Sequence, residues 1–115
     1  MDPSLGMKAI REEDWVALPG FPGLQQIILS GSLDETRRSG RRSRLVRIGA
    51  GMKTTTTLVH EYFEETYLVS GSLHLVQKPG TKIIAPAFVL RPPGTPHGPF
   101  ASDDGCVMLE IHYFV

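Results

Sequence analysis

Short runs of apolar and β-branched residues, separated by turn residues, are the main pattern along the chain. No long segment shows the apolar period of about 3.6 residues that marks an amphipathic helix. The runs that predict β-strands are Trp15–Leu18, Leu24–Leu29, Ser43–Ile48, Thr54–His60, Thr66–Ser70, Ser72–Val76, Lys82–Ile84, Ala87–Leu90 and Val107–Phe114. Turn signals rich in glycine, proline and aspartate lie between them. Many short strands at a spacing of about ten residues predict an all-β sandwich or barrel.

The length and charge of the chain restrict its class. A chain of 115 residues fits one domain, 1–115, in which we expect 1–8 to be flexible and the core to span about 43–115. Twelve basic and twelve acidic residues give zero net charge, so the balance indicates neither a nucleic-acid partner nor a membrane surface. No apolar run approaches about 18 residues, and the start of the chain does not resemble a secretion signal. We therefore expect a cytoplasmic protein, without an internal disulfide because Cys106 is its single cysteine.

The segment Arg37–Arg47 is strongly basic. Gly40 in its middle predicts a hairpin tip between two strands. The simplest interpretation is a solvated loop whose charges repel one another, and the alternative is a docking patch for an anionic ligand or partner. The rest of the chain offers no basic surface and no array of stacking side chains for nucleic acid.

Candidate chemistry lies in the stretch HEYFEETYLVSG. Alternate residues of an extended chain share a face, so we expect Leu58, His60, Tyr62 and Glu64 to point the same way if no turn intervenes. A buried imidazole and carboxylate need partners, and a divalent metal would satisfy both. The tight turn PPGTPH offers His97 as a third ligand. Two histidines and a carboxylate suit Fe, Zn, Mn, Ni or Co, with open positions for an oxygen ligand, whereas ordinary core or surface histidines are the alternative.

The order of these motifs resembles the two-motif signature of the cupin superfamily, G-x5-H-x-H-x3,4-E-x6-G followed by G-x5-P-x-G-x2-H-x3-N. His60–Gly71 matches the end of the first motif without gaps, and Pro92–His97 matches the second. The match covers about Gly49–His112. The phrases EETYLVSG and RPPGTPHGPFASDDGC are most similar to small single-domain cupins, of the type found in zinc-binding anti-sigma factors and related small dioxygenases.

The resemblance implies a cupin-type double-stranded β-helix, a jelly-roll barrel that is often a homodimer, with a divalent metal held inside. The residues that match the ligand positions are His60, Glu64 and His97. The chain departs from the pattern at Leu58, where the family has its first histidine, and at Ala101, where the family often has asparagine. Another registration would begin at His60, place Tyr62 at the second histidine position, and use Glu64 or Glu65 as the acid.

Further residues are candidates for lining the pocket, namely Tyr62, His74, Glu110 and His112. Glu110 and His112 share one face of the last predicted strand, so either could replace the missing ligand if that face points inward. His74 shares a face with Glu64 only if no bulge interrupts the strand at Gly71. An ordinary pocket or surface role is the alternative for both histidines.

Three functions remain open from the sequence. The first is a metal-dependent enzyme of the oxygenase type that acts on a small oxygenated or aromatic compound, with Fe, Zn, Mn or Ni as the ion. The second is a non-catalytic cupin that binds a metal or a small molecule, such as a sensor. The third is a degenerate cupin without metal, for which Leu58 would mark the loss.

Overall fold

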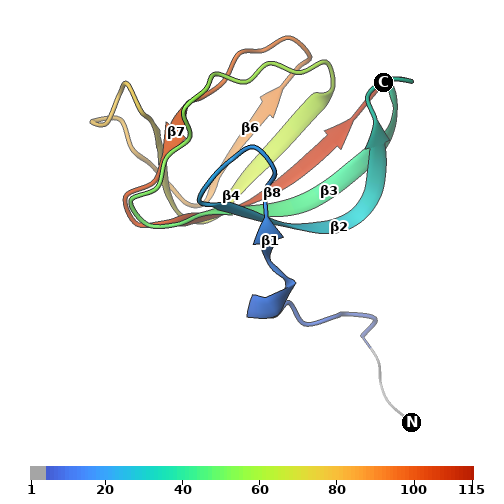
Figure 1. Ribbon diagram of the computed structural model, residues 1–115, viewed down its shortest axis with the longest axis horizontal. Helices are drawn as coiled ribbons and strands as arrows, with labels where there is room; N and C mark the ends of the chain where they lie inside the picture. The colour runs from blue at the N-terminus through green and yellow to red at the C-terminus, as the bar shows by residue number, and fades with distance from the viewer. Residues whose placement is uncertain (1–4) are drawn as a thin grey trace.

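The fold is a curled antiparallel β-sheet, seen in a computed structural model that describes residues 5–115 (Figure 1). Its elements are a turn of 3-10 helix, η1 (Glu12–Asp14), and the strands β1 (Val16–Ala17), β2 (Leu24–Asp34), β3 (Ser39–Ile48), β4 (Phe63–Leu75), β5 (Ile83–Ile84), β6 (Ala87–Arg91), β7 (Phe100–Ala101) and β8 (Cys106–Tyr113). The strand order is β1-β2-β3-β8-β4-β5, and β6 and β7 also pair with β4. The all-β prediction is confirmed, and β1, β5, β6 and β8 match their predicted strands within one residue at each end.

The N-terminal segment leads away from the sheet (Figure 1). Residues 1–4 of the segment predicted to be flexible lie outside the described residues, and Leu5–Lys8 are exposed and form no helix or strand. Arg47 ties η1 to the sheet, because its Nη1 donates to Glu12 Oε2 at 3.0 Å and its guanidinium lies 4.4 Å from the ring centroid of Trp15. In the described part of the chain, no helix combines the length and the apolar character that a membrane crossing requires.

Strand β4 corrects one prediction, because the predicted strands Thr66–Ser70 and Ser72–Val76 form one continuous strand, which ends at Leu75. Gly71 makes no hairpin turn. A Cβ at Gly71 would lie 1.9 Å from the carbonyl oxygen of Gly105, so only glycine allows β4 and β8 to approach each other here. A register shift between Leu68 and Ser70 adds a bulge, and beyond Gly71 strand β4 pairs with β5 and β7 in place of β8 and β6. A single strand therefore serves both halves of the barrel.

The predicted strand Thr54–His60 is wrong, because this threonine-rich segment crosses the barrel as an irregular loop. The loop meets β7 and the segment before it at two isolated bridges, Lys53 with Ala101 and Leu58 with His97, and at single hydrogen bonds such as that from Thr54 N–H to the carbonyl oxygen of Phe100 at 2.8 Å. A segment of high β-propensity forms a strand only where it can pair continuously with a neighbouring strand, and this loop has no such partner. Strand β7 lies opposite the start of this loop, and the sequence did not predict it.

The hairpin β2–β3 is longer than its predicted strands, Leu24–Leu29 and Ser43–Ile48, and turns at residues 35–38 instead of at Gly40. Asp34 sets the turn, since its Oδ1 accepts a hydrogen bond from the backbone N–H of Arg37 at 3.0 Å. Gly40 lies inside β3, opposite Leu33. Most of the basic segment is therefore strand, and its arginines alternate between the two faces of the sheet.

The core lies on the inner face of the sheet. Its buried cluster consists of Leu24, Val46, Ile48, Leu68, Cys106 and Met108. Along β3 and β8, every second side chain points to this inner face. Toward the other end of the two strands, the inward positions are held by charged or polar residues instead of apolar ones, namely Arg42, Arg44, Glu110 and His112. The inner face is thus apolar at one end and charged at the other, and the polar face of β8 points inward.

Candidate metal centre

Glu64 lies at the centre of the charged end, on β4 between β6 and β8. Its cross-strand neighbours are both basic, Arg91 on β6 and His112 on β8. Arg91 Nη1 donates to Oε1 at 3.0 Å, and His112 Nε2 lies 3.0 Å from Oε2. Thr66 donates to Oε1 at 3.1 Å. The strand register therefore fixes the Glu64 carboxylate by hydrogen bonds to both oxygens.

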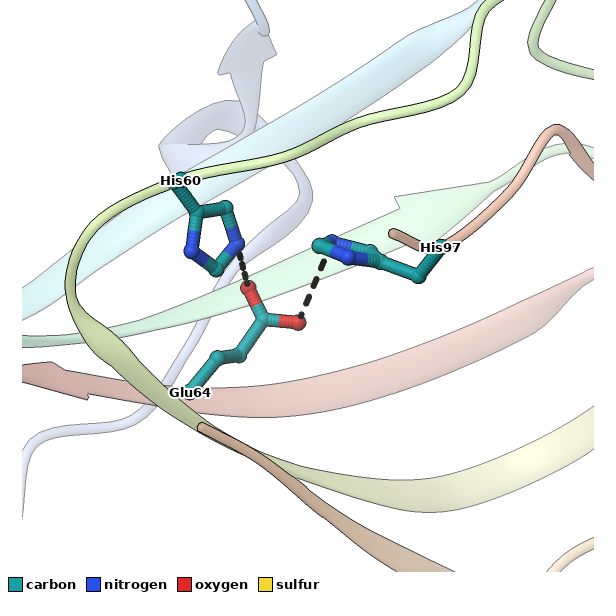
Figure 2. A group of neighbouring side chains, drawn as sticks. All are labelled: His60, Glu64 and His97. Carbon is teal, nitrogen blue, oxygen red and sulfur yellow. Dashed lines mark ion pairs between the residues drawn. The ribbon is translucent and has the colours of Figure 1, made fainter. Parts of the chain in front are cut away.

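Two further histidines reach this carboxylate from loops. His60 Nε2 lies 3.2 Å from Glu64 Oε2, and His97 Nε2 lies 3.9 Å from Glu64 Oε1. Figure 2 shows both rings with a nitrogen directed at the carboxylate. The bridge between Leu58 and His97 holds the two loops together through hydrogen bonds of 2.7 and 2.9 Å. The three candidate ligand atoms lie within 4.8 Å of one another.

Hydrogen bonds at Nδ1 determine the tautomers of these two rings. His97 Nδ1 lies 2.9 Å from the carbonyl oxygen of Thr95, and His60 Nδ1 lies 3.3 Å from that of Tyr62. A carbonyl oxygen only accepts, so each Nδ1 carries the hydrogen and each Nε2 presents a lone pair. His60 Nε2 is buried and has no hydrogen-bond partner. Burial also lowers the pKa of His97, which keeps that ring neutral.

The donor set therefore fits a cation. Two Nε2 lone pairs and a carboxylate oxygen face one another, an arrangement that is repulsive until a cation lies between them. A backbone acceptor on Nδ1 is also the usual support of a metal-bound histidine. Glu64 Oε1 already accepts from Arg91 and Thr66, whereas Oε2 accepts from His112 alone and keeps a lone pair for an ion.

A second group of possible ligands, Glu64, Glu110 and His112, also lies within 4.8 Å but differs in its hydrogen bonding. Arg42 Nη2 and Nε point at His112 Nδ1 from 2.8 and 3.2 Å. A guanidinium only donates, so Nδ1 accepts and Nε2 carries the hydrogen that it shares with Glu64. Arg44 Nε donates to Glu110 Oε1 at 2.8 Å. His112 has no free lone pair, so this group is a structural network.

Burial and charge act in opposite directions on these residues. Burial alone would raise the pKa of Glu64, but the neighbouring His112 and His60 and the charge of Arg91 outweigh it and hold that pKa well below its usual value. Burial lowers the pKa of His112, and Glu110 and Glu64 raise it by more. We nevertheless assign a neutral His112, because two N–H groups of Arg42 point at its Nδ1.

Comparison of the sequence with protein-family models and with curated proteins finds no match. Among solved structures, an acetylacetone dioxygenase from Acinetobacter johnsonii matches with a TM-score of 0.70 and 18% identity, over 95% of this chain and 76% of that chain. An RmlC-like cupin from Shewanella frigidimarina matches with a TM-score of 0.64 and 15% identity, over 92% and 89%.

A structure of SigE with the anti-sigma ChrR from Rhodobacter sphaeroides matches with a TM-score of 0.63 and 23% identity, over 88% of this chain and 50% of that chain. The protein has a cupin fold. The predicted cupin-type barrel is thereby confirmed, and at these identities the likeness concerns the fold alone.

In this cupin-fold protein, Leu58 stands where the cupin motif has its first histidine. Its side chain lines the cavity beside the three candidate ligands. An isobutyl group offers no donor atom, so the position that would supply a fourth ligand is apolar. Glu110 and His112, the possible replacements, already have partners, because Arg44 donates to Glu110 Oε1 and Arg42 donates to His112 Nδ1.

The other predicted pocket residues lie around a cavity of about 760 Å³. Tyr62 is stacked on His60, with ring centroids 3.9 Å apart and an angle of 4° between the planes. Burial raises the pKa of Tyr62 to about 12, so its phenol stays protonated. His74 is buried, lines the same cavity and has an unpaired Nδ1, but it belongs to neither group of possible ligands.

Sequence reasoning missed three arginines of the site, Arg42, Arg44 and Arg91. The signal for two of them was present, because Arg42 and Arg44 have the same parity as the buried Val46 and Ile48 on one strand. Interpreting the basic segment as a loop concealed this alternation. Arg91 gave no comparable signal, since its role depends on the register of β6 against β4.

Proposed function

We propose that the protein is a metal-dependent enzyme of the oxygenase type that acts on a small oxygenated or aromatic compound. The observation that carries the proposal is the buried, unpaired Nε2 of His60, which lies 3.2 Å from Glu64 Oε2 with His97 nearby. Two imidazoles and one carboxylate with open positions form the donor set of non-haem iron oxygenases. The dioxygenase among the fold neighbours supports the same reaction class.

The ion would be held by His60, Glu64 and His97, and Fe, Zn, Mn and Ni all suit these donors. Such an ion supplies Lewis acidity and, as iron, the activation of oxygen. The chain itself does the remaining work. Arg91 and Thr66 orient the carboxylate of Glu64, and the mostly apolar wall of the cavity excludes water from a bound substrate. The cavity volume lies in the usual range for small organic ligands.

A cupin that works without a bound metal is the second candidate. Leu58 removes one family ligand, and Arg91 supplies Glu64 with a counter-ion at 3.0 Å. With both features the carboxylate is paired without any ion. The cavity would then bind a small molecule without catalysis.

Elemental analysis distinguishes the two candidates. The protein would be purified without a metal-chelating tag, and its metal content measured for the wild type, His60→Ala and Glu64→Ala. His74→Ala is the matched control, because His74 is also a buried histidine that lines the cavity. We expect about one ion per chain in the wild type and the control, and loss of the ion in the other two variants.

An absence of metal in the wild type, even after reconstitution, contradicts the metalloenzyme. Where metal is present, uptake of oxygen in the presence of acetylacetone and related small diketones tests the reaction class. Metal without oxygen uptake on any of them favours a non-catalytic metal-binding role.

We also propose a homodimer formed through the outer face of the sheet. An apolar ladder crosses five strands in register there, made of Ile27, Leu45, Leu109, Tyr67 and Phe88. Tyr67 and Phe88 are 43% and 53% exposed, with their ring centroids 4.7 Å apart. A second copy would remove this apolar surface from water.

Light scattering tests the homodimer. The wild type should be a dimer and Tyr67→Lys a monomer, and a monomeric wild type contradicts this proposal.

A further inference from the structure

The charges that line the cavity do not balance. Its charged side chains are Arg42, Arg44, Lys78, Arg91, Glu64 and Glu110. Cationic groups therefore outnumber anionic groups by four to two. Positive charge without a counter-ion in a mostly apolar cavity is unfavourable, and it attracts an anion. A bound divalent ion would increase this excess.

Of the two cations that make up this excess, Lys78 is exposed to solvent and Arg42 is half-buried. Arg44 is paired with Glu110, and Arg91 is paired with Glu64. Within residues 5–115, Arg42 forms no ion pair, and its only hydrogen-bond partner is the neutral His112 Nδ1. Those bonds use Nε and Nη2, which leaves Nη1 without a partner among the described residues.

The surroundings of Arg42 suit a polar group of a ligand. Arg42 is half-buried on β3 and lines the same cavity as the three candidate metal ligands. The phenol of Tyr62 lines the same cavity and offers a second hydrogen-bond donor, and apolar side chains such as Phe21 and Phe100 line the wall elsewhere.

We propose that Arg42 binds the carboxylate of an organic acid whose apolar body fills the remainder of the cavity. This inference deepens the proposed function by naming the ligand class, and it rests on the same cavity but not on a bound metal. Arg42 Nη1 would donate charge-assisted hydrogen bonds to the carboxylate. The carboxylate would neutralise the charge of Arg42, and the hydrogen bonds from Arg42 Nε and Nη2 to His112 would stay in place.

Matched pairs of acids and amides test the proposal. Binding of acetate, benzoate and 3-phenylpropionate would be compared with binding of the three corresponding primary amides by calorimetry, on protein treated with chelator. Each pair has nearly the same shape and differs in charge. We expect at least one acid to bind about tenfold or more tightly than its amide, as a charge-assisted hydrogen bond would give.

Variants assign the effect to one residue. Arg42→Gln should abolish the preference for the acid, and Arg42→Lys, which keeps the charge, should retain part of it. Arg41→Gln is the control, because Arg41 is the exposed neighbour on the same strand and its loss changes the net charge equally. Circular dichroism would establish that each variant is folded.

The inference is overturned if no acid is preferred over its amide, if Arg42→Gln keeps the full preference, or if Arg41→Gln loses as much as Arg42→Gln. These outcomes differ from a failure of the proposed function. A protein that never holds metal but still discriminates acid from amide through Arg42 refutes the metalloenzyme alone. A metal-loaded protein whose acid preference is independent of Arg42 refutes the present inference alone.

Discussion

Glu64 faces two groups of side chains that are similar in composition and different in hydrogen bonding. On the strand side, Arg42 and Glu64 bond the two nitrogens of His112, and Arg44 donates to Glu110 Oε1. On the loop side, each histidine uses Nδ1 on a backbone carbonyl and leaves Nε2 free. The comparison teaches that a histidine and a carboxylate form a candidate metal site only where a lone pair is unoccupied.

The largest effect is expected from the residue that both sides share. Glu64→Gln removes the anion that a metal needs and leaves the charge of Arg91 without its partner. We expect metal affinity to fall at least a hundredfold. The free energy of unfolding should fall by about 3 kcal/mol, the cost of breaking a buried ion pair. Metal titration and urea unfolding measure the two effects, and a variant that keeps both properties contradicts the central role of Glu64.

Substituting one histidine on each side separates stability from metal binding. His112 is fully buried and bonded at both nitrogens, so His112→Leu should lower the free energy of unfolding by about 2 kcal/mol or more. Metal affinity should change little. His60→Leu should do the reverse, with a loss of unfolding free energy near 1 kcal/mol and a loss of metal affinity of about a hundredfold. Equal effects of the two variants on either property would show that the two sides do not differ.

Restoring the missing family ligand should strengthen the loop side. Leu58→His places an imidazole where the cupin motif has one, beside the three candidate ligands. We expect metal affinity to rise about tenfold, because one more neutral nitrogen joins the donor set. Val59→His, at an exposed neighbouring position, is the control and should leave the affinity unchanged. No gain from Leu58→His would indicate that the cavity is not organised around an ion.

The smallest effect concerns acid stability. The folded protein holds the pKa of Glu64 well below the usual 4.5, so below that pH the unfolded chain binds a proton that the folded chain does not. The stability from Glu64 is therefore fully present above pH 4.5 and is lost as the pH falls through the folded pKa. The loss should approach about 1.4 kcal/mol per pH unit. Urea unfolding between pH 5.5 and 3.5 should show that the free energy of unfolding declines more steeply for the wild type than for Glu64→Gln. Parallel declines would contradict the lowered pKa of Glu64 in the folded protein.

The sequence predicted the features of the fold that depend on local patterns. Alternation within a strand placed Glu110 and His112 together on one face of β8, and that face points inward. Local patterns failed at Gly71, where composition indicated a turn and a close approach of β4 to β8 demands glycine inside a strand. They failed again at Thr54–His60, whose β-propensity is not matched by a continuous partner.

The sequence proposes the three candidate ligands but not the residues that surround them. The spacing of His60 and Glu64, with the PPGTPH turn before His97, carried the motif in the sequence itself. The arginines could not be placed in the same way, because their partners lie across the sheet. Whether His112 has a free nitrogen depends on Arg42, which stands 70 residues away in the chain and meets it through the register of β3 against β8.

The count of metal-bound imidazoles tests the central claim most directly. Electron spin-echo envelope modulation of the copper(II)-substituted protein distinguishes one coordinated imidazole from two or three. We predict two in the wild type and in His112→Leu, and one in His60→Leu and in His97→Leu. Three imidazoles in the wild type, or loss of one on substitution of His112, would place the ion on the strand side and contradict the account.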